Sequence, residues 1–249
     1  AGGLTTTFYA DVRPVPSIGA GGVVDAASYQ AGNGLAAGSY ISIFGTALSD
    51  ATQFLSTDFL PFAMSGVSVS FSSPDGAKSW PGRLWYVGPT QINLQIPWEV
   101  QGMSSVQLTV NVADVSVPYT LPIAPYLPAM FQYNSLAIAQ DKNYQLVTAS
   151  NPAQRGQYII VYANGLGAVD HPPASGEATP SQPLASTLVT PAVTIGGVTA
   201  QVLFSGLTPD SIGLYQIDVV VPSNAPAGVQ PVLVSQNGVT SQPANLPIE

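Results

Sequence analysis

His171 is the only histidine of the chain and the first residue to consider for acid–base chemistry. It follows Asp170 in a segment rich in proline and serine, VDHPPASGEATPSQP, which also contains Glu177. A hydrolase of the serine type places its nucleophile at a G-x-S-x-G turn, and this motif does not occur in the sequence. We interpret His171 as a solvated loop residue, and the sequence predicts no catalytic residue.

The carboxylates do not follow a metal-binding pattern. Asp170 and Glu177 are candidates to join loop carbonyls around Ca²⁺, but the D-x-[DN]-x-[DN]-G spacing is absent. A zinc site needs three or four ligands, and the chain has one His and no Cys. The 13 acidic residues lie mainly in turns and do not mark the carboxylate pair of a glycosidase. The sequence therefore predicts no metal, no cofactor and no enzyme activity.

Three tryptophans lie close together in the sequence, around a segment that alternates like a strand. Trp80, Trp85 and Trp98 form a candidate platform on which sugar rings could stack, which makes carbohydrate a candidate partner. The alternative is that Trp85 and Trp98 fill a core or the contact between two domains, since large aromatic side chains dominate such contacts.

Charged residues make up only 7% of the sequence, against about 25% in typical globular proteins. The net charge is −8, with five Lys and Arg in total, so clustered cations that would bind nucleic acid or an anionic membrane are missing. A surface with so few charges keeps molecules apart poorly, and this favours association between subunits.

The absence of cysteine fits an exported protein whose domains are large enough to fold without disulfides. The sequence begins AGGLTTTFYADV, without an initiator Met, which we interpret as removal of a signal peptide. No apolar run approaches the roughly 18 residues that span a bilayer. We therefore expect a secreted protein, extracellular or on the cell surface, without a membrane span.

Two parts of the sequence repeat each other. The segment GSYISIFG from Gly38 resembles GQYIIVYA from Gly156, 118 residues later. TQINLQIP contains Gln91 and resembles YQIDVVVP, in which Gln216 lies 125 residues after Gln91. Each copy closes on a similar phrase, TLPIAP and NLPIE, as expected for two tandem copies of one domain.

Each copy has the period of two that is typical of half-buried strands. Turn signals separate the strands at Pro74-Asp75-Gly76, Gly196-Gly197 and Asn237-Gly238. The predicted fold is all-β: two tandem Ig-like antiparallel β-sandwich domains with an N-terminal extended arm. We expect the arm and a linker at 1–22, the first domain at 23–131 and the second at 132–249. The predicted inward positions include Ile92, Leu94 and Ile96, and Ile217, Val219 and Val221.

Several long phrases resemble the Solibacter-type C-terminal domain, a family of uncharacterised domains of secreted acidobacterial proteins. The resemblance covers roughly residues 23–249 and implies secretion and a pair of β-sandwiches. It implies no activity, and it carries over no catalytic residue. Residues 1–22 lie outside it. The matching phrases are VVDAASYQAGNGLAAGSYISIFGTALSD, LWYVGPTQINLQIPWEV, NPAQRGQYIIVYANGLGAVD and VTIGGVTAQVLFSGLTPDSIGLYQIDVVVP.

The N-terminal arm has the pattern of a strand with one mostly apolar face, formed by Leu4, Thr6, Phe8, Ala10 and Val12. Prolines follow it, and the glycines of 19–22 predict a flexible joint. Apolar burial alone does not offset the entropy lost on ordering this segment, so the arm needs a sheet edge that pairs with its backbone. Three arrangements remain open: donation to a neighbouring subunit, a first strand within its own domain, or a disordered tail.

We expect an extracellular structural protein that forms a homopolymer, a filament or surface layer, by head-to-tail donation of the N-terminal strand. The alternative is a non-catalytic secreted adhesion or carbohydrate-binding module.

Overall fold

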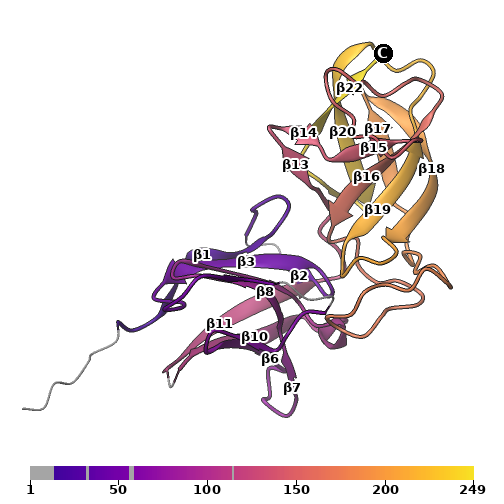
Figure 1. The fold of residues 1–249 in the computed structure, drawn as a ribbon. Coiled ribbons are helices and arrows are strands. Elements are labelled where there is room, and N and C mark those ends of the chain that lie inside the picture. Colours follow the sequence, from indigo (N-terminus) through magenta and orange to yellow (C-terminus); the bar gives the residue numbers. More distant parts are fainter. Residues whose placement is uncertain (1–13, 32–33, 56–58, 114) are drawn as a thin grey trace, which may run out of the picture.

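The structure is a computed structural model that describes residues 14–31, 34–55, 59–113 and 115–249. The predicted arm residues, Leu4 to Val12, lie outside the described residues. The described chain is all-β, with several sheets and one short 3-10 turn. It builds two hydrophobic cores, one in each half of the chain, and Figure 1 shows the two halves meeting at an angle.

The first half contains two facing sheets. One has the order β1-β3-β9-β8-β4, and the other has the order β2-β11-β10-β6-β5 with β7 beside β6. Their elements are β1 (Ser17–Asp25), β2 (Leu35–Ala36), β3 (Tyr40–Thr46), β4 (Gln53–Phe54), β5 (Ala63–Met64), β6 (Val67–Ser72), β7 (Ser79–Pro81), β8 (Arg83–Val87), β9 (Gln91–Gln95), the 3-10 turn η1 (Trp98–Val100), β10 (Ser105–Val112) and β11 (Val115–Ala124).

The second half forms one continuous sheet path, β12-β16-β19-β18-β17-β20-β22-β14-β13, because the long strand β18 pairs with both β19 and β17. β15 pairs with β16, and β21 pairs with β20. The strands are β12 (Ala129–Met130), β13 (Gln132–Tyr133), β14 (Leu136–Ala137), β15 (Ala139–Asp141), β16 (Tyr158–Asn164), β17 (Ala192–Ile195), β18 (Val198–Leu207), β19 (Tyr215–Val220), β20 (Gly228–Gln236), β21 (Val239–Thr240) and β22 (Ala244–Ile248).

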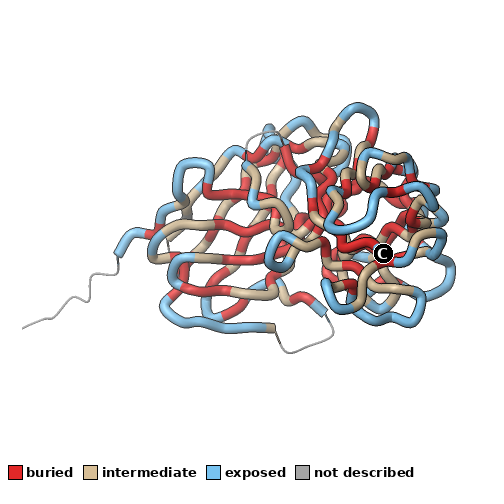
Figure 2. Tube along the Cα trace, turned by 90° about the horizontal axis from the view of Figure 1, so that it is seen from above, coloured by how far each residue is buried: buried red, intermediate tan, exposed pale blue. Residues whose placement is uncertain are grey.

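The alternation of apolar residues correctly predicts which side chains face the cores. All six of the inward positions named above, on and just after β9 and β19, are fully buried. Figure 2 shows buried segments running through the centre of both halves, with the exposed segments mostly in turns and loops. Burial of such aliphatic side chains contributes about 1.5–3 kcal/mol each, so the alternation of each strand fixes which face turns inward.

The strand register repeats between the two halves. Tyr40 pairs with Gln95 where β3 meets β9, and Tyr158 pairs with Val220 where β16 meets β19. Tyr40 and Tyr158 lie 118 residues apart, and Gln95 and Val220 lie 125 residues apart. The repeated sequence phrases show the same two spacings. A bulge also recurs in the adjacent strand, at Trp85 in β8 and at Leu203 in β18, again 118 residues later.

A similar turn follows β1 and β15, one residue shorter after β15. The carboxylates of Asp25 and Asp141 each accept two backbone N–H groups from the residues that follow them. Tyr29 and Tyr144 then adopt left-handed backbone conformations, with φ of 56° and 60°. Both tyrosine side chains are exposed, 62% and 68%. These two turns therefore provide a matched pair of surface tyrosines in different surroundings.

The glycine-rich segment expected as a flexible joint is part of β1 instead. β1 spans Ser17–Asp25 and pairs with β3 on both sides of a register shift between Ile18 and Val23. A Cβ on Gly22 would lie 2.5 Å from the carbonyl oxygen of Phe44, so this close backbone approach requires glycine. The glycines build a bulge in an edge strand and do not separate an arm from a domain.

The segments that lead into the two halves also correspond. Ser17 at the start of β1 pairs with Thr46, and Ala129 at the start of β12 pairs with Asn164, which lies 118 residues after Thr46. Ser17 therefore corresponds to Ala129. Two residues earlier, Val15 corresponds to Leu127. Leu127 packs against the core of the first half, and its N–H donates to the carbonyl of Gly165. Val15 is 75% exposed.

Trp98 joins the two cores. It lies in η1 of the first half, yet its side chain, only 8% exposed, belongs to the core cluster of the second half. The ring also lies against Gly38, where a Cβ would meet the indole at 2.2 Å. Gly38 has a φ of +77°. Its counterpart Gly156 has a φ of +76°, and no atom lies within 4 Å of the place that a Cβ would occupy there.

Gly38→Ala is therefore expected to destabilise the protein more than Gly156→Ala. Both substitutions carry the left-handed backbone penalty of about 1–2 kcal/mol. Only Gly38→Ala adds overpacking against Trp98, which costs about 1–3 kcal/mol more. Urea denaturation of the two variants and the parent protein measures the difference, and equal losses in both variants would contradict the packing described for Trp98.

Candidate functional site

Buried amide groups connect the two halves. Gln95 is fully buried at the end of β9, where its Nε2 donates to the carbonyl of Gly38 at 3.1 Å. Its Oε1 accepts the N–H of Gly176, which lies in the second half, at 2.8 Å. A neighbouring contact joins Ser175 to the backbone N–H of Trp98 at 2.9 Å. The loop of 165–191 in the second half is thereby fixed against the first half.

Asn164 forms the second polar connection. Its side chain bonds both backbone groups of Tyr40, accepting the N–H at 3.0 Å and donating to the carbonyl at 2.8 Å. Its Nδ2 also donates to Asp25 at 2.6 Å. Burial raises the pKa of the Asp25 carboxyl above its ordinary value of 3.8, against hydrogen bonds from Ser28, Ala27 and Asn164 that lower it.

A large groove opens beside these contacts, with a volume of about 960 Å³. We call it the junction groove, because both halves line it. The first half contributes residues of β3, β8 and β9 and nearby loops, and the second half contributes the loop of 210–214 and two further residues. The lining residues are Ala26, Tyr29, Tyr40, Ser42, Leu55, Leu60, Trp85, Asn93, Phe131, Ala178, Asp210, Ser211, Ile212 and Leu214.

The aromatic side chains of the groove are held in place by one another. Tyr40 and Trp85 meet edge to face, with ring centroids 6.3 Å apart and planes at 76°. Tyr29 packs against Phe44 at 6.3 Å. Burial raises the pKa of the Tyr40 hydroxyl, so Tyr40 stays protonated and uncharged. The Nε1 of Trp85 is buried and has no hydrogen-bond partner among the described residues.

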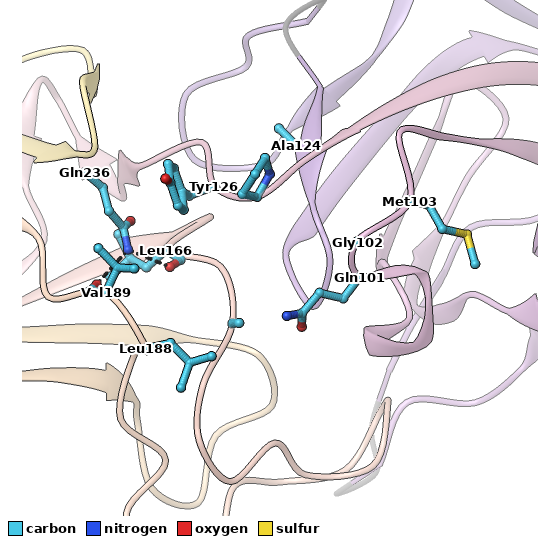
Figure 3. A pocket seen from close by; sticks show the side chains of 11 residues that line it. Gln101, Gly102, Met103, Ala124, Tyr126, Leu166, Leu188, Val189 and Gln236 are labelled. Atoms are coloured by element: carbon cyan, nitrogen blue, oxygen red, sulfur yellow. Dashed lines mark hydrogen bonds between the residues drawn. The ribbon is translucent and has the colours of Figure 1, made fainter.

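A smaller hollow of about 280 Å³ lies elsewhere on the junction (Figure 3). Its walls are mostly apolar and include Tyr126, Leu166 and Leu188. The Gln236 amide donates to the carbonyls of Leu166 and Val189 at 3.1 and 2.7 Å, as the dashed lines in Figure 3 show. These bonds tie β20 to the loops that line the hollow.

The structure does not bring the three predicted platform tryptophans together. Trp80 lies on β7 and packs against the first core, whereas Trp98 is buried between the cores. Trp85 lines the junction groove. His171 is a solvated loop residue, as predicted, with its Nδ1 3.0 Å from Asp170.

The described residues contain no group of three or more His, Cys, Asp and Glu side chains placed to hold a metal ion. Within the same part of the chain, no helix is long and apolar enough to cross a membrane.

Sequence reasoning missed most of the groove. Tyr40, Ser42 and Asn93 occupy outward positions of β3 and β9, next to the buried positions that the alternation identifies. The signal that was available is that these outward positions carry aromatic and amide side chains in place of charged ones. Phe131 and the 210–214 loop come from the second half, and only the tertiary structure places them there.

The comparisons with protein-family models and with curated proteins found no match. Among solved structures, the chain is similar to an endo-fucoidan hydrolase from glycoside hydrolase family 107, at 12% identity and a TM-score of 0.18. The match covers 94% of this chain and 29% of the length of that enzyme. A TM-score this low shows neither a shared fold nor a shared activity.

The raised pKa of Asp25 leads to a prediction about stability and pH. The folded protein holds this proton to higher pH than the unfolded chain, so the stabilisation is fully present below the unfolded pKa, about 3.8. It is lost as pH rises through the folded pKa. The free energy of unfolding of the parent protein is therefore expected to fall more between about pH 4 and pH 7 than that of Asp25→Asn, measured by urea denaturation.

The comparison of slopes separates Asp25 from other groups. Asp218, whose pKa burial also raises, contributes equally to both proteins. Parallel pH profiles of the two proteins would show that Asp25 is not the group responsible.

Proposed function

We propose that this protein is a secreted, extracellular structural subunit that assembles head to tail into a filament or surface layer. In this proposal each half is an Ig-like antiparallel β-sandwich domain, one of two tandem copies. The repeated register and the repeated bulge support a common origin of the two halves. The proposal also assigns the chain to the family of secreted domains that its phrases resemble.

The exposed position of Val15 carries the proposal. Its counterpart Leu127 packs against the core of the preceding half, so the leading segment of the second half is anchored on the first. Val15 is exposed at the corresponding place. The correspondence with a docking contact in the other copy supports contact of Val15 with a further sandwich. We propose that the sandwich contacted by Val15 is the end of the second half of another subunit.

The placement of the described ends supports a linear assembly. β1 begins at the end of the first half farthest from the second half, and the chain ends at the far side of the second half (Figure 1). A contact between opposite ends of two copies is head to tail, and such a contact propagates unless its rotation closes a ring. The low charge of the surface reduces the repulsion between copies.

The predicted arm strand is the segment that we propose to be donated between subunits. In the proposal the arm adds a strand to a free sheet edge of a neighbouring subunit, with main-chain hydrogen bonds as the principal contacts. Phe8 and Leu4 lie on the apolar face that the neighbour would cover.

Removal of residues 1–13 is expected to convert fibres into monomers, each smaller than the 25.6 kDa of the full chain, because the donated strand is lost. Phe8→Asp should weaken assembly nearly as much, since it places a charge on the buried face. Thr7→Asp adds the same charge to the opposite face and serves as the control. Negative-stain microscopy and sedimentation velocity measure the outcome, and fibres that persist after the deletion would refute strand donation.

A further inference from the structure

We propose that the junction groove binds an uncharged carbohydrate chain, a role separate from assembly. Its walls combine several aromatic side chains with a few polar groups, the composition that is typical of ligand sites. Its volume of about 960 Å³ lies near the upper end of the range for such sites. Tyr29, Tyr40, Trp85 and Phe131 supply apolar faces, against which the C–H faces of sugar rings pack.

The polar groups of the groove suit hydroxyl ligands. Ser42 and Asn93 face each other across β3 and β9 as register partners and point to the same side of the sheet. The Oδ1 of Asn93 accepts a hydrogen bond from Gln91 at 2.8 Å, which orients its amide nitrogen for donation. A hydroxyl both donates and accepts, so it can pair with an amide nitrogen and a serine on the same surface.

The charges of the groove exclude anionic ligands. Asp210 is the only acidic residue among the described lining residues, and no Lys or Arg lines the groove. A sulfated or carboxylated glycan, or a nucleic acid, would therefore meet like charge without a compensating cation. The net charge of −8 adds to the repulsion.

The backbone of the groove disfavours an extended peptide. β3 lies between β1 and β9, and β9 lies between β3 and β8, so both strands under the groove are already paired on each side. A peptide that binds by strand addition needs a free edge, and the floor of the groove offers none. A carbohydrate needs only side-chain contacts, and these are present.

The fixed junction makes the groove a pre-formed site. The Gln95 contact fixes the 165–191 loop against the first half, and Thr179 of that loop bonds the backbone of Asp210 and Ser211 at the groove. Asn164 fixes the end of β16 against Tyr40. A site that is already ordered loses less entropy when a ligand binds.

The test is isothermal titration calorimetry of the full chain with neutral hexasaccharides, namely cellohexaose, xylohexaose and mannohexaose, and with a hyaluronan hexasaccharide as the charged probe. At least one neutral probe is expected to bind, and the hyaluronan probe is expected not to. Tyr29→Ala and Trp85→Ala should each weaken binding by about tenfold or more, or about 1.4 kcal/mol.

Tyr144→Ala is the matched control, because Tyr144 is an exposed tyrosine with a left-handed backbone in the corresponding turn of the second half and does not line the groove. This variant should bind within about twofold of the parent protein. Tyr29 is exposed, so its removal leaves the fold intact even if Trp85→Ala proves unstable. Absence of binding by all three neutral probes at millimolar concentration, preference for hyaluronan, or an equal loss in Tyr144→Ala would overturn the proposal.

Discussion

Gln95, Asn164 and Trp98 hold the two cores together, and the shape of the groove depends on them. Gln95 bonds the carbonyl of Gly38 and the N–H of Gly176, and Asn164 bonds the N–H and the carbonyl of Tyr40. Such neutral hydrogen bonds are worth about 0.5–1.5 kcal/mol each, but an unsatisfied group left behind costs about 1–3 kcal/mol. An alternative arrangement of the junction that left one of these groups unsatisfied would therefore cost more free energy than one hydrogen bond contributes. This cost favours the observed geometry.

The sequence is sufficient to predict the strands and their inward faces, because the period of two reports directly on burial. The buried positions of β9 and β19 and the turn at Asn237-Gly238 illustrate this. It is not sufficient for Gln95, which sits in phase with the outward residues of β9 and yet is fully buried. A strand pattern reports the inner face of a sheet, and whether another part of the chain covers the outer face is a tertiary property.

The same limit explains the tryptophans and the glycines. Trp80, Trp85 and Trp98 are neighbours in the sequence, but β7, β8 and η1 carry them to three different environments. The glycines of 19–22 have the composition of a linker, but backbone contact with β3 uses their small size in a bulge. Proximity along the chain and residue composition are weak guides where a close backbone approach determines the residue type.

The two halves share their backbone register more closely than their side chains. Gln95 corresponds to Val220 and Asn164 to Thr46, so the residues that form the internal junction have no chemical equivalents in the other copy. Another subunit therefore cannot dock by repeating this set of polar contacts. Any contact between subunits must use different side chains from those at the internal junction.

The position of β1 has a mechanical consequence. The described chain starts at one extreme of the molecule and ends at the opposite extreme, so tension applied along this direction passes through both halves in series. At the leading end the pull acts on β1, whose antiparallel pairing with β3 is interrupted by the glycine bulge. The hydrogen bonds on the two sides of this bulge form separate groups under load, and the short outer group at Ser17 and Ile18 would be the first to yield.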